Sequence, residues 1–241
     1  MQKPLSLMNK VPLLSLQLSV GPYANFLSRI ADMGACRVSS YVCVANVHML
    51  VEAWRNPAYA EVVNQAALVT PDGMPLSIGL RWLYGMHQSR VAGMDLLPDL
   101  IATAAHRKLN VFFFGSTPTV LAQVVATCQT QFPSCSVVGS FSPPFRVMSS
   151  DEEDAIITLI NASGANLVFV ALGCPKQEKW MARMQGRVQA VMLGVGGALP
   201  VFAGLQNRAP DWMQRLSLEW LYRLYQEPGR LWKRYFLTNS I

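Results

Sequence analysis

The sequence predicts an α/β fold, namely a Rossmann-like, doubly wound and mostly parallel sheet with a helical C-terminal appendage. Three observations support this. Short apolar runs of strand length recur along the chain, segments of helical period separate them, and the pattern changes at Asn207. The chain has 241 residues, of which 51% are apolar and 14% charged, enough for one sizeable core. We therefore expect an α/β core over residues 1–206 and an appendage over 207–241.

The expected strands are nearly continuous apolar runs. They lack the alternation of half-exposed strands, as is typical of parallel sheets covered by helices on both faces. Their ranges are 40–47, 66–70, 110–116, 135–141, 166–173 and 189–197.

The expected helices lie between these runs. One begins with a capping box of Ser150 and Glu153, which explains the acidic run at 151–154 as a helix start. No Asp-x-Asp pair occurs anywhere, although metal-dependent sugar-nucleotide enzymes often carry one. The helical ranges are 48–65, 75–86, 94–108, 118–131, 150–163 and 176–186.

Several classes of protein find no support in the sequence. Five cysteines without a CxxC pair indicate neither a zinc site nor a disulfide framework, and the three histidines are dispersed. The apolar stretch 190–205 has 16 residues and several glycines, which favours a buried strand and a glycine turn over a membrane span. The pI of about 9.2 permits nucleic-acid binding, but no motif for it appears. No secretory signal is recognisable, so we expect a cytoplasmic protein.

The C-terminal segment 207–241 is basic and aromatic. It contains six basic and three acidic residues, so it carries +3 of the formal net charge of +6. Within it, the basic residues 230, 233 and 234 share one helical face, and apolar and aromatic residues occupy the other. Two interpretations remain open: a helix at the membrane interface, or a helix docked on the core with solvated arginines.

Ligands of open α/β sheets bind beyond the carboxyl ends of the strands. Asp72 and Gly73 follow the strand at 66–70, where an aspartate is either an ordinary turn residue or a general base. Gly115 and Ser116 end the strand at 110–116 ahead of a proline. They predict a helix N-terminus that either binds an anion or is simply capped.

Two further strand ends carry candidate residues. In the segment "GCPKQEKW" we expect Lys176 and Gln177 to donate to phosphate or sugar hydroxyls, while Glu178 caps, pairs locally or competes as the base. The cluster "GVGGALP" contains Gly196 and Gly197, which permit close backbone approach to a ligand. A dinucleotide fingerprint would need glycine where Leu199 stands, which disfavours a nicotinamide-dependent oxidoreductase.

Taken together, these motifs resemble the WecG/TagA/CpsF family, glycosyltransferase family 26. The stretches that carry the resemblance span roughly residues 40–238. They are "NVHMLVEAWRNPAYAEVVNQAALVTPDGMPL", "RVAGMDLLPDL", "FFFGSTPTVL", "LVFVALGCPKQEKWM", "GVGGALPVFAG" and "RAPDWMQRLSLEWLYRLYQEPGRLWKRYFL".

The resemblance implies an inverting, metal-independent transfer of a sugar from a UDP-sugar to a polyprenyl-diphosphate-linked saccharide in bacterial cell-surface polysaccharide synthesis. The enzyme would need no cofactor and would work as a peripheral protein at the inner face of the cell membrane, with homo-oligomers possible. Asp72 matches the family's base, and Gln177 is expected near a sugar. Arg223 and Arg230 are expected to close over the site and neutralise the diphosphate. The substrate-binding residues expected from the motifs and the resemblance are Asn46, Gly73, Gly115, Ser116, Lys176, Glu178, Gly196, Gly197 and Arg208.

The sequence departs from the family pattern near the expected donor site. Val44 stands where many members have threonine, Pro200 lies where many have Phe-Asp-Phe, and "SPPF" at 142–145 replaces Gly-Tyr-Phe. The transferred sugar is therefore either N-acetylmannosamine or a hexose such as glucose. A non-catalytic UDP-binding or scaffold protein is the alternative.

Overall fold

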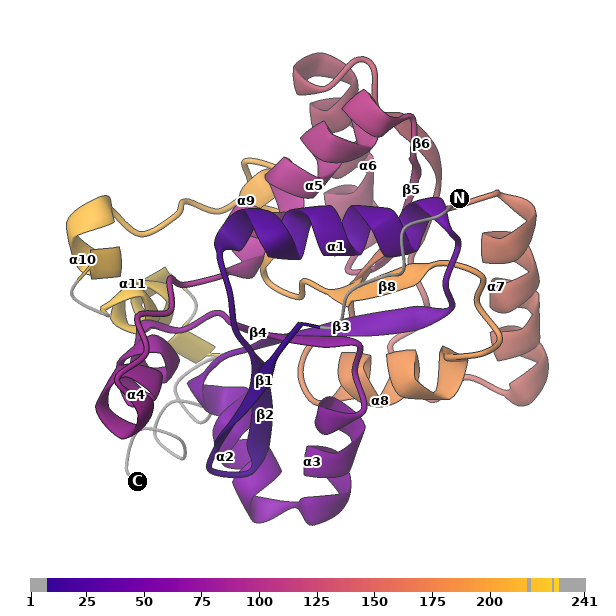
Figure 1. The fold of residues 1–241 in the computed structure, drawn as a ribbon. Coiled ribbons are helices and arrows are strands. Elements are labelled where there is room, and N and C mark those ends of the chain that lie inside the picture. Colours follow the sequence, from indigo (N-terminus) through magenta and orange to yellow (C-terminus); the bar gives the residue numbers. More distant parts are fainter. Residues whose placement is uncertain (1–7, 216–217, 227, 230–241) are drawn as a thin grey trace.

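A computed structural model describes residues 8–215, 218–226 and 228–229 of the chain. Its centre is a six-stranded parallel sheet in the order β4-β3-β8-β7-β5-β6 (Figure 1). All six expected strands are present, and the doubly wound α/β prediction is confirmed. The strands are β3 (Ser40–Ala45), β4 (Leu68–Pro71), β5 (Asn110–Gly115), β6 (Ser136–Phe141), β7 (Leu167–Ala171) and β8 (Val191–Gly194).

Helices cover both faces of the sheet and create two apolar cores (Figure 1). Consecutive strand residues point to opposite faces, so Phe113 stacks on Phe169 in one core while Phe114 stacks on Trp180 in the other. The first core is covered by α1 (Tyr23–Ala35), α5 (Gly93–Arg107), α6 (Pro118–Gln131) and α9 (Ala198–Phe202). The second is covered by α2 (Val47–Arg55), α3 (Pro57–Asn64), α7 (Ser150–Ala162) and α8 (Lys176–Met184).

The N-terminal part of the chain holds elements that the sequence did not reveal. Strands β1 (Lys10–Leu13) and β2 (Leu16–Ser19) form an antiparallel hairpin, and α1 follows it. Leu13, Leu16 and Leu18 are buried in the core that α2 and α3 cover. Residues 10–19 therefore form a hairpin that extends this core.

Two helix boundaries differ from the predicted ones. The expected helix 48–65 is two helices, because Asn56 caps α3 by accepting from the Tyr59 backbone N–H at 3.2 Å. The capping box of α7 lies one residue earlier than expected: Ser149 Oγ accepts from the Glu152 N–H, and the Glu152 carboxylate accepts from the Ser149 N–H at 2.9 Å. Two overlapping S-x-x-E spacings exist here, and the sequence pattern alone does not choose between them.

The apolar stretch 190–205 is not a membrane span. It contains β8, the glycine turn and the short helix α9. Within the described ranges, no helix combines the length and the apolar character that crossing a membrane requires.

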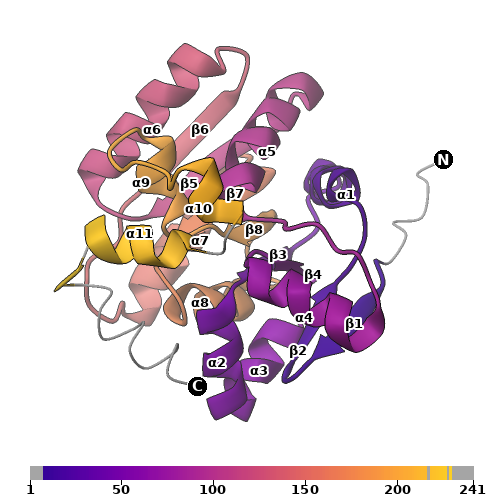
Figure 2. The same cartoon turned by 90° about the vertical axis from the view of Figure 1, so that its left-hand side faces the viewer.

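The strand-end side of the sheet carries three more helices, α4 (Met74–Tyr84), α10 (Asp211–Arg215) and α11 (Glu219–Gln226), which Figure 2 shows facing the viewer. The last two confirm that the appendage is helical over its described part. The predicted basic and aromatic helix after Pro228 and Gly229 lies outside the described residues, and the division at residue 206 remains a prediction.

Candidate active site

The carboxyl ends of β3, β4, β5, β7 and β8 surround a crevice of about 320 Å³. Six of the residues expected at the site line it: Asn46, Asp72, Ser116, Gln177, Gly196 and Gly197. They come from separate motifs, and the parallel sheet brings them together because all its strands end at the same edge.

Asp72 lies at the end of β4, where two hydrogen bonds hold the backbone. Its N–H donates to the Ala45 carbonyl at 2.8 Å, and the Val91 N–H donates to the Pro71 carbonyl at 2.8 Å. Gly73 follows as the N-cap of α4 and is not among the lining residues. Asp72 is therefore a carboxylate on a fixed backbone, partly exposed to the crevice.

Asn46 serves both a helix and the crevice. Its Oδ1 accepts from the Met49 backbone N–H at 3.1 Å and caps α2. The side-chain oxygen is thus occupied, and the Nδ2 hydrogens are the donors that remain for a ligand.

The turn after β5 has a restricted backbone. Gly115 has φ +106°, and a Cβ there would lie 2.5 Å from the Ala171 carbonyl oxygen. Ser116 has φ +61°, and its N–H donates to the same carbonyl at 2.9 Å. The N–H of Ser116 is therefore not free for an anion, contrary to the expectation. Gly115 shapes the turn without lining the crevice, whereas Ser116 and the helix cap Thr117 do line it.

Both the oxygen and the nitrogen of the Gln177 side-chain amide form hydrogen bonds within the protein. Nε2 donates to Glu178 Oε1 at 2.7 Å, and Oε1 accepts from the Gly173 N–H at 3.2 Å. Cβ atoms at Gly194 and Gly196 would lie 2.9 and 3.3 Å from the amide. These two glycines therefore make room for the protein's own glutamine as well as bordering the crevice.

Glu178 lies behind Gln177, away from the crevice. None of its surface is exposed, and it also accepts from Tyr59 Oη at 3.1 Å. Burial raises the pKa of the Glu178 carboxyl, although hydrogen bonds from Gln177 and Tyr59 act in the opposite direction. Glu178 and Lys176, both expected at the ligand, are not among the residues that line the crevice.

No role of Arg90 is predicted from the sequence. Its guanidinium donates to Glu219 at 2.8 Å and to Gln214 at 3.0 Å, and it pairs with Asp95 at 3.4 Å. Glu219 itself lines the crevice, so Arg90 ties α11 to the strand-end side of the core. The only sequence signal for this role is that Arg90 begins the family stretch "RVAGM". A single arginine in a motif does not reveal which residues it pairs with.

The remaining expected residues belong to the appendage. Arg208 pairs with Asp95 at 2.6 Å and is not a lining residue. The side chain of Arg223 and all of Arg230 lie outside the described residues.

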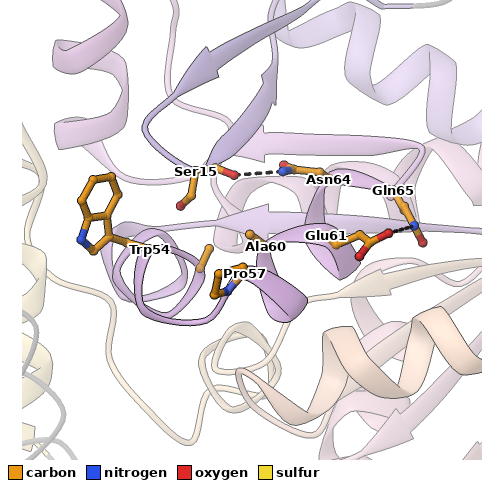
Figure 3. Close-up of a pocket in the computed structure, with 8 residues that line it drawn as sticks. Ser15, Trp54, Pro57, Ala60, Glu61, Asn64 and Gln65 are labelled. Carbon is orange, nitrogen blue, oxygen red and sulfur yellow. Dashed lines mark hydrogen bonds between the residues drawn. The ribbon is translucent and has the colours of Figure 1, made fainter.

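A second hollow, of about 650 Å³, lies between α2, α3 and the β1–β2 turn and is wide open to solvent. Figure 3 shows Trp54, Pro57 and Glu61 around it. None of the expected site residues lines it, so the strand-end crevice is the candidate active site.

Comparison with known proteins gives a match over almost the whole chain. The model of the glycosyl transferase WecG/TagA/CpsF family matches residues 11–241. The chain belongs to this family. The resemblance seen in the motifs is thereby confirmed, and the chain is a glycosyltransferase, which overturns the oxidoreductase alternative.

Two Bacillus proteins are similar to this chain. Both are named N-acetylglucosaminyldiphosphoundecaprenol N-acetyl-beta-D-mannosaminyltransferase. The Bacillus spizizenii protein is 34% identical over 81% of this chain and 74% of its own length. The Bacillus subtilis protein is 31% identical over 82% of this chain and 75% of its own length.

Proposed function

We propose that the protein transfers N-acetylmannosamine from a UDP-linked donor to an N-acetylglucosamine that is carried on a polyprenyl diphosphate. The names of both relatives support the sugar and the acceptor class. Neither name describes the transfer of glucose, so N-acetylmannosamine is favoured over a hexose as the transferred sugar. The observation that carries the proposal is the meeting of Asn46, Asp72 and Gln177, from three strand ends, in one crevice.

In this proposal Asp72 is the general base. An inverting transfer needs one base that removes the proton of the acceptor hydroxyl as that oxygen attacks the anomeric carbon. Asp72 borders the crevice on a fixed backbone, whereas the competing Glu178 is fully buried and holds two donors. The bond to the UDP oxygen breaks as the new glycosidic bond forms, and the proton goes to the Asp72 carboxylate.

Gln177 and Asn46 orient the sugars in this mechanism. Their amides are fixed before a ligand arrives, since Gln177 is held by Glu178 and Gly173 while Asn46 is held by the end of α2. Donors fixed in this way need no reorganisation during the reaction. In this proposal Arg223 and Arg230 neutralise the charge of the departing diphosphate. The hydroxyls of Ser116 and Thr117, at the crevice wall, assist them.

A donor screen tests the proposal. The intact protein is incubated with a short-chain lipid-diphosphate N-acetylglucosamine acceptor and UDP-N-acetylmannosamine, UDP-N-acetylglucosamine or UDP-glucose. We expect product from UDP-N-acetylmannosamine. Product from UDP-glucose alone would overturn the assignment of the sugar.

The donor screen combined with calorimetry addresses the non-catalytic alternative. Val44 and Pro200, which depart from the family pattern, both line the crevice and so contact the region in which a donor would bind. UDP binding by calorimetry, without turnover of any donor, would favour a binding or scaffold protein.

A further inference from the structure

Helix α4 exposes a large apolar surface on the side of the molecule where the crevice lies. Trp82 is 84% exposed and Leu83 63% exposed, and Ile78 stands one turn before Trp82 on the same face of the helix. Leu76 and Leu80 anchor the opposite face in the core. We call the exposed Ile78 and Trp82, together with the exposed Leu83 beside them in the last turn, the α4 apolar face.

The exposure of these residues is not explained by packing within the described part of the chain. Isolated exposed apolar side chains are common, but neighbouring large ones on a helix usually mark a contact surface. On α11, Trp220 and Tyr225 are also exposed, and α11 lies on the same side of the molecule as α4 (Figure 2). Exposed aromatic side chains therefore occur on both helices of this side.

The charge beside the α4 apolar face favours an anionic lipid surface. No aspartate or glutamate occurs between residues 73 and 94, and the exposed Arg81 stands next to Trp82. Tryptophan prefers the headgroup region of a bilayer, and arginine beside it meets the lipid phosphates. A water-soluble partner would need an apolar groove to receive the Trp82 indole and the two aliphatic side chains. Nothing in the described residues points to such a partner.

Helix α4 places such a contact close to the proposed base, Asp72. The helix begins directly after Asp72 and Gly73, and its 11 residues extend about 16 Å from the crevice at 1.5 Å per residue. A polyprenyl chain stays in the bilayer, so the reacting sugar must be reached near the headgroups. We propose that the α4 apolar face rests in the headgroup region of an anionic bilayer. This membrane contact belongs to the core, is separate from the tail after residue 229, and brings Asp72 within reach of the lipid-linked acceptor.

The inference rests on the proposed function for its purpose, but its test does not need turnover. The intact protein is sedimented with vesicles of phosphatidylcholine, with and without phosphatidylglycerol. The variants are the double substitution Ile78→Ser with Trp82→Ser, the single Leu83→Ser, and Leu159→Ser as a matched control. Leu159 is 44% exposed on α7, at the far end of the sheet from α4 (Figure 1).

We expect the double variant to bind phosphatidylglycerol vesicles about tenfold more weakly than the unmodified protein, because burial of two large apolar side chains is lost. Leu83→Ser should weaken binding to a lesser degree, and Leu159→Ser should leave it unchanged. Unchanged vesicle binding by the double variant would overturn the proposal. Equal losses in Leu83→Ser and Leu159→Ser would also overturn it.

Two further measurements separate the alternatives. Sedimentation velocity without vesicles shows whether a second copy of the chain covers the α4 apolar face; a dimer that dissociates in the double variant, with vesicle binding retained, would overturn the lipid assignment. Turnover of a short-chain, water-soluble acceptor should be the same in all variants. If vesicle binding depends on α4 but no protein shows turnover, the membrane contact stands and the proposed transfer fails.

Discussion

Gln177 and Glu178 are consecutive buried residues, joined by a hydrogen bond of 2.7 Å from Gln177 Nε2 to Glu178 Oε1. Gln177 borders the crevice, whereas Glu178 lies beneath it with no exposed surface. Tyr59 Oη donates to the other carboxylate oxygen of Glu178 and links α3 to the same network. The orientation of the crevice amide is therefore set by a buried carboxylate that no ligand reaches.

Replacing Glu178 by leucine should lower kcat/KM by about tenfold or more. The change leaves Gln177 Nε2 and Tyr59 Oη without their acceptor, so the amide loses its fixed orientation. Glu178→Gln keeps one acceptor oxygen and should recover part of the loss. Steady-state kinetics with a short-chain acceptor, together with UDP affinity by calorimetry, measure the effect. A wild-type kcat in Glu178→Leu would show that the network does not position Gln177.

The buried Glu178 carboxyl should also make stability depend on pH. Burial raises its pKa above the ordinary value of 4.5, so the folded protein keeps this proton to a higher pH than the unfolded chain does. In that interval the unfolded state binds fewer protons, and the free energy of unfolding contributed by this group falls as pH rises. Urea unfolding of the wild type and Glu178→Gln from about pH 4 to pH 8 tests this. The wild type should lose stability relative to the variant as pH rises above 4.5. A difference that stays constant over this range would contradict the expectation.

Asp72→Asn should reduce kcat by about 10²- to 10⁴-fold, the usual contribution of a general base. UDP binding should stay near the wild-type value, because asparagine has the same shape and the backbone hydrogen bonds at this turn are unchanged. Asp151→Asn is the matched control, since Asp151 is an exposed carboxylate in the first turn of α7. If Asp72→Asn turned over like the control, another group would be the base.

Arg90→Ala should loosen α11. Arg90 and Glu219 are both largely buried and 2.8 Å apart, and a pair of this kind typically contributes about 1 kcal/mol or more. We expect faster amide hydrogen exchange in residues 219–226 and a lower kcat/KM, because Glu219 borders the crevice. Arg187→Ala, which removes an exposed pair with Asp154, should change neither quantity. Identical exchange of α11 in both variants would rule out the proposed link.

Gly115→Ala should destabilise the fold far more than Gly173→Ala. Both glycines have positive φ, +106° and +79°, so alanine strains the backbone at each by about 1 kcal/mol. At Gly115 the new Cβ would also lie 2.5 Å from the Ala171 carbonyl oxygen, whereas nothing lies within 4 Å at Gly173. Urea unfolding should show an excess of about 2 kcal/mol at Gly115. Equal losses at the two positions would mean that the β5 turn yields to accommodate the methyl group.

The sequence predicted the sheet better than it predicted the helix ends. Every expected strand is present, because apolar runs of this length are stable only when they are covered on both faces. The break at Asn56 was missed and the cap at Ser149 was placed one residue too late, because both depend on which of several polar side chains bonds to the backbone. The hairpin of β1 and β2 was missed because polar residues and Pro12 interrupt its apolar positions, so no continuous apolar run marks either strand.

Which residues gather at the site follows from the order of the strands along the chain. Asn46, Asp72, Ser116 and Gln177 all follow apolar runs, and parallel strands bring such positions to one edge. How these residues are used depends on packing between distant segments. The tertiary structure turned Glu178 away from the crevice, because adjacent helical residues point about 100° apart and the motif does not say which of them faces inward. It also paired Arg90 with Glu219, 129 residues away, since such a contact depends on how the whole chain packs and leaves no local pattern.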